Sequence, residues 1–177
     1  TRDVDYKLEE TYTFNSGDIA EIIGKNGVRT SYLWGYNNSE PVAQIVNAKQ
    51  SQIYYNSFET TGGTVGVSKT GSKYLASGVY TIPFTPPSDG MTYKMSYWYW
   101  SASKWNFSGE LPFSTSVSSG TQLDEIRVYP VGALMTTYTY DLGKGISTIT
   151  DPNGASTYYE YDSLGRLQVT KDNNRNI

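Results

Sequence analysis

Three tryptophans lie close together in one stretch and could bind a ligand. The segment YKMSYWYWSASKW, residues 93–105, contains Trp98, Trp100 and Trp105. Alternate side chains of a strand point to one face, so Trp98 and Trp100 would stand side by side about 7 Å apart. Flat indole faces stack on the apolar faces of sugar rings, and an exposed tryptophan otherwise costs free energy. The chemistry indicated is carbohydrate binding. The nearest polar side chains for sugar hydroxyls are those of Lys94, Ser96 and Asn106.

The alternation of this strand predicts which face is open. One face carries no charge and includes a methionine, so we expect it to face the core; it comprises Tyr93, Met95, Tyr97 and Tyr99. The other begins with a lysine and a serine, so we expect it to be outward; it comprises Lys94, Ser96, Trp98 and Trp100. The alternative is that a loop, the flanking strands or a neighbouring domain covers the tryptophans, because aromatic clusters usually serve packing.

A second strand, LDEIRVYP at residues 123–130, holds an unusual carboxylate. Strict alternation puts Asp124 on one face with Ile126 and Val128. A carboxylate among apolar side chains needs a cation or several hydrogen-bond donors. The opposite set, Glu125, Arg127 and Tyr129, is expected to face solvent.

Catalysis has few candidate groups in this chain. Histidine and cysteine are both absent, which excludes a Ser-His-Asp triad, thiol chemistry and zinc sites built on either residue. Glycoside hydrolysis needs only two carboxylates. Glu59, Glu110 and Glu125 are candidates, but none lies in a recognisable motif. A hydrolase is therefore a remote alternative, and the sequence requires no cofactor.

Charge and hydropathy limit the partners. The 177 residues carry 14 Lys and Arg against 17 Asp and Glu, a net charge of -3 without a basic stripe. This argues against nucleic acid and anionic membranes as partners. The apolar runs are too short for membrane insertion. Residues 1–10 show no signal-peptide pattern, and Thr1 indicates a piece of a longer protein.

Along the whole chain, short segments rich in Tyr, Thr, Val and Ile alternate with turn residues. This alternation predicts many short antiparallel strands. The C-terminal part repeats with a period of 21 residues: Tyr140, Ile146 and Asp151 recur as Tyr161, Leu167 and Asp172. Such a period is typical of stacked β-hairpins. The N-terminal part has the same pattern, with Ile19 and Ile22 before Gly27. We expect the Asp and Asn residues of YDSLG and DPNG to form turns and to have no binding role.

These repeats carry a resemblance. YEYDSLGRLQVTKDNN and YTYD…ITDPNGASTYYEYD resemble the YD repeats of the RHS family, and TSYLWGYN…PVAQIVNA is similar to a segment of RHS-type bacterial surface proteins. The resemblance implies a secreted or cell-surface protein whose repeats form a continuous β-sheet. Its neighbours would be further RHS repeats of the full-length chain.

The middle of the chain carries another resemblance. Between Lys49 and Val131 the repeat spacing disappears, and NSFET, SGVYTIPF, YKMSYWYW and LDEIRVYP resemble jelly-roll carbohydrate-binding modules and their galactose-binding-like relatives. This implies an antiparallel β-sandwich with a structural calcium site at Glu59 and Asp124. Alternatively, Asp124 accepts backbone N–H bonds from a loop. The segment is short for a jelly roll, so either strands are missing or the flanking repeats complete the sheets.

The sequence therefore predicts an all-β protein: a jelly-roll-like antiparallel β-sandwich at residues 49–131, flanked by YD-repeat hairpins at 1–48 and 132–177. The first functional hypothesis is an extracellular, non-catalytic module that binds a polysaccharide or cell-surface glycan. The residues assigned to it are Trp98, Trp100, Trp105, Lys94 and Asn106. The alternative is a structural spacer or assembly module with no ligand.

Overall fold

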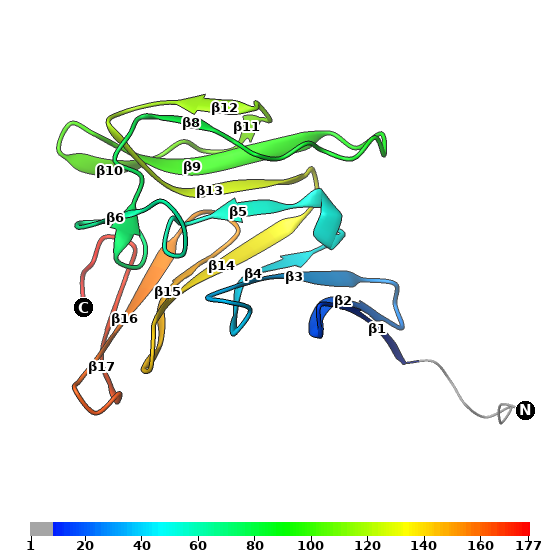
Figure 1. Cartoon of the computed structure of the whole chain (residues 1–177), viewed down its shortest axis with the longest axis horizontal. Coiled ribbons are helices and arrows are strands. Elements are labelled where there is room, and N and C mark those ends of the chain that lie inside the picture. Colours follow the sequence, from blue (N-terminus) through cyan, green and yellow to red (C-terminus); the bar gives the residue numbers. More distant parts are fainter. Residues whose placement is uncertain (1–8) are drawn as a thin grey trace, which may run out of the picture.

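A computed structural model describes residues 9–177, which form layers of antiparallel β-sheet (Figure 1). No α-helix occurs in this range; one short 3-10 turn, η1 (Gln50–Gln52), interrupts the strands. The all-β antiparallel sandwich predicted from the sequence is confirmed. Residues 1–8, which belong to the segment without a signal-peptide pattern, lie outside the described residues.

The largest layer is an eight-stranded sheet of hairpins drawn from both ends of the chain. In spatial order its strands are β1 (Glu10–Asn15), β2 (Asp18–Gly24), β3 (Arg29–Gly35), β4 (Glu40–Val46), β14 (Leu134–Asp141), β15 (Gly145–Thr150), β16 (Ser156–Tyr161) and β17 (Leu167–Lys171). Strands β4 and β14 pair directly, with Ile45 opposite Met135. The chain therefore leaves this hairpin sheet after β4 and returns beside the strand it left.

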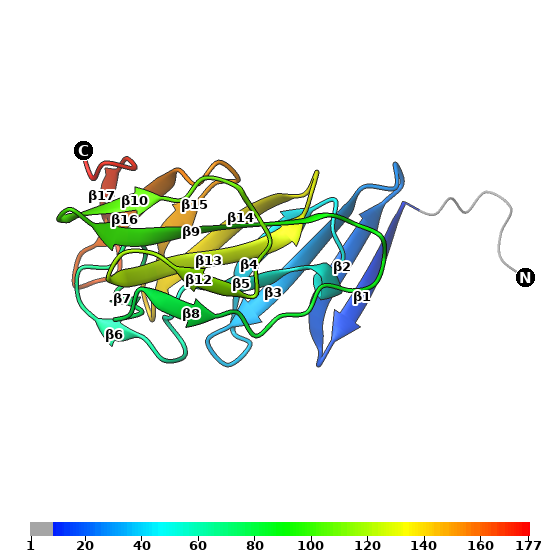
Figure 2. The ribbon, with the colours of Figure 1, turned by 90° about the horizontal axis from the view of Figure 1, so that it is seen from above.

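The intervening residues form the other layers. A five-stranded middle sheet contains β10 (Lys104–Phe107), β9 (Tyr93–Ser101), β13 (Gln122–Pro130) and β5 (Tyr54–Asn56), with β11 (Leu111–Pro112) on β9. Two small ribbons pair β8 (Val79–Thr81) with β12 (Ser116–Ser118), and β6 (Thr64–Val65) with β7 (Lys73–Tyr74). Figure 2 shows β9 and β13 crossing over the central strands of the hairpin sheet.

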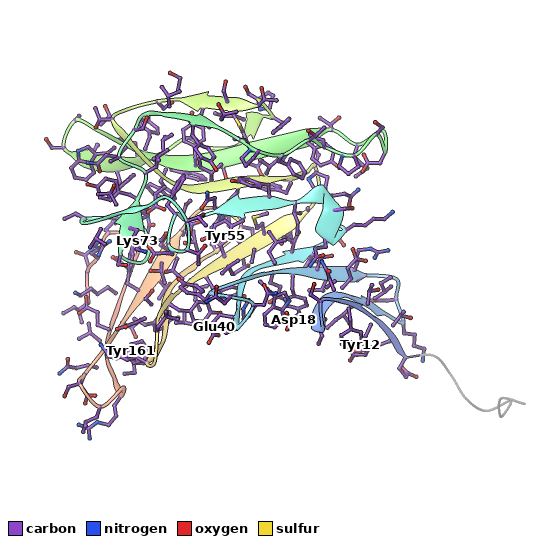
Figure 3. All side chains as sticks on the ribbon, in the orientation of Figure 1. Tyr12, Asp18, Glu40, Tyr55, Lys73 and Tyr161 are labelled. Atoms are coloured by element: carbon purple, nitrogen blue, oxygen red, sulfur yellow. The ribbon has the colours of Figure 1, made fainter. Side chains whose placement is uncertain are left out.

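The middle sheet buries both of its faces. On one side it packs on the β8–β12 ribbon, in a core of Phe58, Ile82, Tyr93, Met95, Tyr97, Val117, Leu123, Ile126 and Val128. On the other it packs on the hairpin sheet, in a core of Ala43, Ile45, Ala48, Ile53, Tyr129, Ala133 and Met135. Side chains such as that of Tyr55 fill this second gap (Figure 3). The predicted core face of β9 is confirmed, and the repeat hairpins provide the layer that the middle segment lacks.

Four hairpins of the large sheet, β1–β2, β3–β4, β14–β15 and β16–β17, carry a β-bulge at the same place. The register shifts immediately before Phe14, Trp34, Tyr140 and Tyr161, so an aromatic residue follows every bulge. The cross-strand partners repeat as well, since Phe14 faces Ile19 and Tyr140 faces Ile146. The similarity predicted between the N-terminal and C-terminal repeats is thus confirmed in the strand register.

These aromatic residues form a ladder of hydrogen bonds across the sheet. Each of the three that follow Phe14 donates to a backbone carbonyl, that of the residue paired with the preceding aromatic residue. The bonds are Trp34 Nε1–H to Ile19 O, Tyr140 O–H to Pro41 O and Tyr161 O–H to Ile146 O, all at 2.8 Å. The bond from Tyr140 to Pro41 joins the two halves of the hairpin sheet.

The turns between C-terminal strands are built on aspartates. The Oδ1 atoms of Asp151, Asp162 and Asp172 each accept backbone N–H bonds from residues two and four positions later. This confirms the turn-forming role predicted for Asp151 and Asp162. Arg175 occupies the turn position at which the other two turns have glycine, and its φ of 66° lies in the left-handed region that disfavours side chains.

Candidate functional site

The tryptophan face of β9 points towards the hairpin sheet. Trp98 is 8% exposed and Ser96 is 1% exposed, so the expectation of an open face is wrong at these positions. Phe107 lies against Trp98 with ring centroids 5.2 Å apart, and the Lys69 Nζ atom lies 3.9 Å from the Trp98 ring. The expectation failed because the hairpin sheet and the loop at residues 66–72 cover this face.

Lys69 is the centre of the buried cluster around Trp98. Its side chain is inserted between Trp98 and Tyr158, with Nζ 5.5 Å from the centroid of the Tyr158 ring. The amine donates to Asn173 Oδ1 at 2.8 Å and to Asn173 O at 3.3 Å. Arg175 packs on Tyr158 at 4.3 Å and donates from Nη2 to Ser68 O. Burial first, and the charge of Arg175 second, lower the pKa of Lys69 to about 8.

Two buried carboxylates hold the same loop by its backbone. Asp124 Oδ2 accepts the N–H groups of Lys69 and Thr70, both at 2.9 Å. Glu59 Oε1 accepts the N–H groups of Ser72 and Lys73 at 2.8 and 2.7 Å. Burial raises the pKa of both carboxyls.

These contacts bear on the calcium site that the jelly-roll resemblance implies. The N–H donors occupy the carboxylate oxygens of Glu59 and Asp124, whereas calcium requires several oxygen ligands. Across residues 9–177 no three or more acidic side chains gather in a way that could hold a metal ion. The geometry favours hydrogen-bonded carboxylates over a calcium ion.

A bulge in β13 overturns the predicted alternation of that strand. Asp124 pairs with Trp98 of β9, and Arg127 pairs with Ser96 of β9. Two residues of β13 therefore lie between these pairs where β9 has one, so β13 holds one extra residue. Glu125 takes it up with a φ of 55°. Asp124 therefore lies on the side of Trp98 and not with Val128, which lies in the other core.

The predicted solvent face of β13 is buried instead. Glu125, Arg127 and Tyr129 are 1%, 2% and 3% exposed. The expectation was wrong because alternation distinguishes two faces but does not show that a second sheet covers the polar one. A charged pair in this position must satisfy its polar atoms within the protein.

The partners of this charged pair come from the hairpin sheet and from β5 of the middle sheet. Arg127 Nε lies 3.2 Å from Glu125 Oε2. The guanidinium also donates from Nη2 to Thr137 Oγ1 at 2.5 Å and from Nη1 to Asp151 O at 2.8 Å. Glu125 Oε1 accepts the Tyr55 hydroxyl at 3.1 Å. The polar groups of three separate chain segments thus meet around one buried ion pair.

Trp100 and Trp105 remain partly exposed. They are cross-strand neighbours on β9 and β10, with ring centroids 5.6 Å apart and ring planes at 72°. Tyr74 lies against Trp105 at 6.3 Å. Beside them the loop exposes Val67, which is 74% exposed and whose carbonyl accepts the Trp105 Nε1–H. Trp100, Trp105 and Tyr74 thus form one partly exposed aromatic surface, with Val67 at its edge.

The other predicted sugar-binding residues lie apart from this surface or already form hydrogen bonds within the protein. Lys94 lies towards the opposite end of β9, where its amine contacts Glu110 Oε2 at 2.6 Å. The Asn106 amide donates to two backbone carbonyls of its own hairpin, those of Ser101 and Lys104. The predicted sugar-binding residues therefore do not form one site. Of the predicted tryptophans, Trp100 and Trp105 are the partly exposed ones.

The carboxylates considered for glycoside hydrolysis serve other contacts. Glu59 holds a loop, Glu125 is paired with Arg127, and Glu110 binds Lys94 and the Tyr129 hydroxyl. The lowered pKa of Glu110, caused first by Lys94, is the opposite of what a general acid requires.

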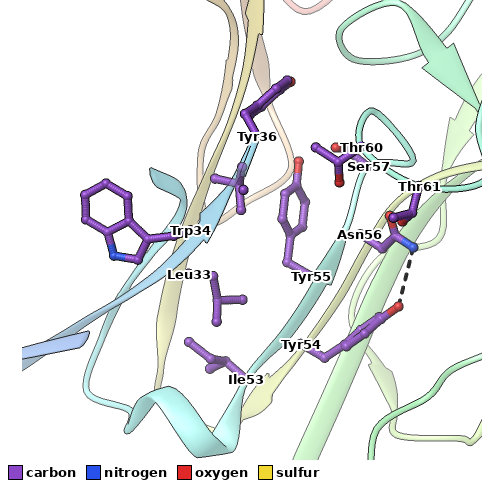
Figure 4. A pocket seen from close by; sticks show the side chains of 12 residues that line it. Leu33, Trp34, Tyr36, Ile53, Tyr54, Tyr55, Asn56, Ser57, Thr60 and Thr61 are labelled. Carbon is purple, nitrogen blue, oxygen red and sulfur yellow. Dashed lines mark hydrogen bonds between the residues drawn. The ribbon is translucent and has the colours of Figure 1, made fainter. Parts of the chain in front are cut away.

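A cavity of about 350 Å³ opens between β3 and β5 (Figure 4). Its lining residues come from distant parts of the chain, so sequence reasoning missed it, and they include Leu33, Tyr36, Tyr55, Asn56 and Thr60. Several of its polar atoms already have partners: the Tyr36 hydroxyl accepts the Tyr140 N–H, and the Asn56 amide donates to Tyr80.

The C-terminal part of the chain matches a known family model. Residues 142–176 match the family model described as RHS Repeat. This part of the chain is therefore similar to an RHS repeat. Its matched range includes β15, β16 and β17 with their aspartate turns. No curated protein matches the chain.

The segment that matches the RHS repeat model contributes directly to the buried cluster. Tyr158, Asn173 and Arg175 all lie within it and enclose Lys69, while Asp151 binds Arg127. Within the part of the chain that the structure describes, no helix is long and apolar enough to span a membrane.

Proposed function

We propose that this chain is a non-catalytic structural part of a secreted or cell-surface RHS-type protein. In this proposal residues 49–131 are an inserted unit locked onto the repeat sheet. The observation that carries it is the buried Glu125–Arg127 pair, whose partners Thr137 and Asp151 belong to the repeat hairpins. The surface location rests on the RHS resemblance.

The energetics of the buried pair support a fixed arrangement. Arg127 and Glu125 are almost completely removed from solvent, and removing one partner of such a pair typically costs about 3–5 kcal/mol. Separating the inserted unit from the hairpins would also expose the second core, including Ile45, Tyr129 and Met135. The inserted unit and the repeats should therefore unfold together.

Comparing two arginine variants tests this proposal. Arg127→Ala removes the guanidinium from the buried network, whereas Arg166→Ala removes an exposed one that pairs with Asp162. In urea unfolding, we expect one transition in the wild-type protein, a large loss of stability in Arg127→Ala and little change in Arg166→Ala. Separate wild-type transitions for the inserted unit and the hairpins would refute the locked arrangement.

Glycan binding is the second candidate function. The exposed pair of Trp100 and Trp105 supports it, because two partly exposed indoles next to an exposed Val67 present an apolar surface that could stack on sugar rings. The partner would be a polysaccharide or cell-surface glycan. Trp98 has no part in this version of the hypothesis, because Lys69 and Phe107 cover it.

A further inference from the structure

The amine of Lys69 is held against a side-chain amide. Lys69 is 4% exposed, and its Nζ lies 2.8 Å from Asn173 Oδ1. The two residues are far apart in the chain: Lys69 is on the loop before β7, and Asn173 is in the turn after β17. Their contact joins the inserted unit to the RHS repeat.

The surroundings of Lys69 favour a reactive amine. The rings of Trp98 and Tyr158 lie beside Nζ and keep water away from it. Desolvation and the nearby Arg175 lower the Lys69 pKa to about 8, so the neutral amine is accessible near physiological pH. Desolvation of this kind activates lysine as a nucleophile.

The amide of Asn173 is polarised. Besides the lysine, the backbone N–H of Ser156 donates to Asn173 Oδ1 at 3.0 Å. This donor draws electron density from the amide carbon, and it would stabilise the negative charge that develops on Oδ1 during attack. The Ser156 N–H belongs to β16, so the donor is fixed by the hairpin sheet.

The backbone of Lys69 is fixed as firmly as its amine. Its N–H binds Asp124 at 2.9 Å, and its carbonyl accepts the Tyr158 hydroxyl at 2.9 Å. Burial raises the pKa of the Asp124 carboxyl, and the charges of Glu125 and Asp124 partly oppose the lowering of the Lys69 pKa. A buried amine and a partly buried, polarised amide are thus held together beside buried carboxyl groups, and such positioning accelerates reactions between neighbouring groups.

We propose that Lys69 and Asn173 form an intramolecular isopeptide bond. Lys69 Nζ bonds to Asn173 Cγ, the Cγ–Nδ2 bond breaks, and the amide nitrogen leaves as ammonia. The lysine ammonium gives up two protons: one converts the leaving amide nitrogen to ammonia, and the other protonates that ammonia to an ammonium ion, so the step needs no oxidant, cofactor or activated substrate. The inserted unit is then attached covalently to the last turn of the RHS repeat, which goes beyond the non-covalent locking proposed above.

Intact-mass and peptide mass spectrometry of the purified chain test the bond. We expect a mass lower than the sequence mass by one ammonia. Trypsin should fail to cleave after Lys69, because the amine is acylated, and peptide 50–73 should be joined to peptide 172–175.

Matched variants identify the residues. Lys69→Arg keeps a cation but lacks the amine nucleophile, and Asn173→Ala lacks the electrophile, so both should have their full sequence mass. Asn174→Ala changes the neighbouring exposed asparagine and should retain the loss of ammonia. A wild-type chain with its full sequence mass and normal cleavage after Lys69 would overturn the proposal. The unfolding comparison of Arg127 and Arg166 variants separately tests the non-covalent arrangement.

Discussion

Asp124 lies directly opposite Trp98 in the middle sheet, and both residues contact Lys69. The carboxylate binds the backbone of the lysine and the indole contacts its amine. This pairing depends on the bulge at Glu125, which moves Asp124 to the side of the sheet that faces the hairpins. One irregular residue therefore allows the middle sheet to fix the loop that reaches the segment matching the RHS repeat model.

The buried Asp124 should make stability depend on pH. Its pKa is raised mainly by burial, so the folded state holds the proton to a higher pH than the unfolded state does. The resulting stabilisation is complete below the unfolded pKa near 4 and is lost as pH rises through the folded pKa. Relative to Asp124→Asn, the wild-type free energy of unfolding should therefore fall from pH 4 to pH 8. Urea titrations at several pH values measure this, and a constant difference between the two proteins would contradict it.

The aromatic ladder should stabilise the join between the two repeat tracts. Tyr140→Phe removes the hydroxyl that donates to Pro41 O, and we expect it to lower the free energy of unfolding by about 1 kcal/mol. Tyr159→Phe on β16, a partly exposed tyrosine outside the ladder, is the control. Denaturant unfolding measures both, and equal effects would show that the Tyr140 hydrogen bond has no particular role.

The sequence predicted the hairpins well because their signals are local. The 21-residue period correctly placed Tyr140 and Tyr161, and alternation correctly assigned Tyr93, Met95 and Tyr97 to a core. The cover over Trp98 could not be predicted, because it depends on β4 pairing with β14 and bringing distant hairpins under β9. The candidate site was hidden for the same reason: Lys69 lies in an ordinary polar loop and meets Asn173 through the fold alone. The bulge at Glu125 had no glycine to mark it.

Glycan binding makes a separate prediction for the exposed tryptophans. If a polysaccharide stacks on this surface, titration should shift the tryptophan fluorescence, and Trp100→Ala and Trp105→Ala should each weaken binding at least several-fold. Trp34→Phe is the control, because Trp34 lies in the hairpin sheet, away from this surface. A panel of polysaccharides that leaves the fluorescence of the wild-type protein unchanged would exclude this function for the glycans tested.

Removal of divalent cations should leave stability unchanged. The oxygens of Glu59 and Asp124 are occupied by N–H donors of the loop at residues 69–73, so we expect the melting temperature to be the same with EDTA and with added calcium. Differential scanning calorimetry measures this. A melting temperature that rises with calcium and falls with EDTA would restore the structural calcium site that the jelly-roll resemblance implies.

Native-state hydrogen exchange tests most directly whether residues 49–131 are locked onto the hairpin sheet. If the inserted unit is locked onto the repeat sheet, the amides of β13 and those of β14 and β15 should exchange with the same opening free energy, close to that of global unfolding. Arg127→Ala should lower the protection of all three strands together. If the β13 amides lose protection while those of β14 and β15 remain fully protected, the inserted unit opens independently. That result would contradict the locked arrangement.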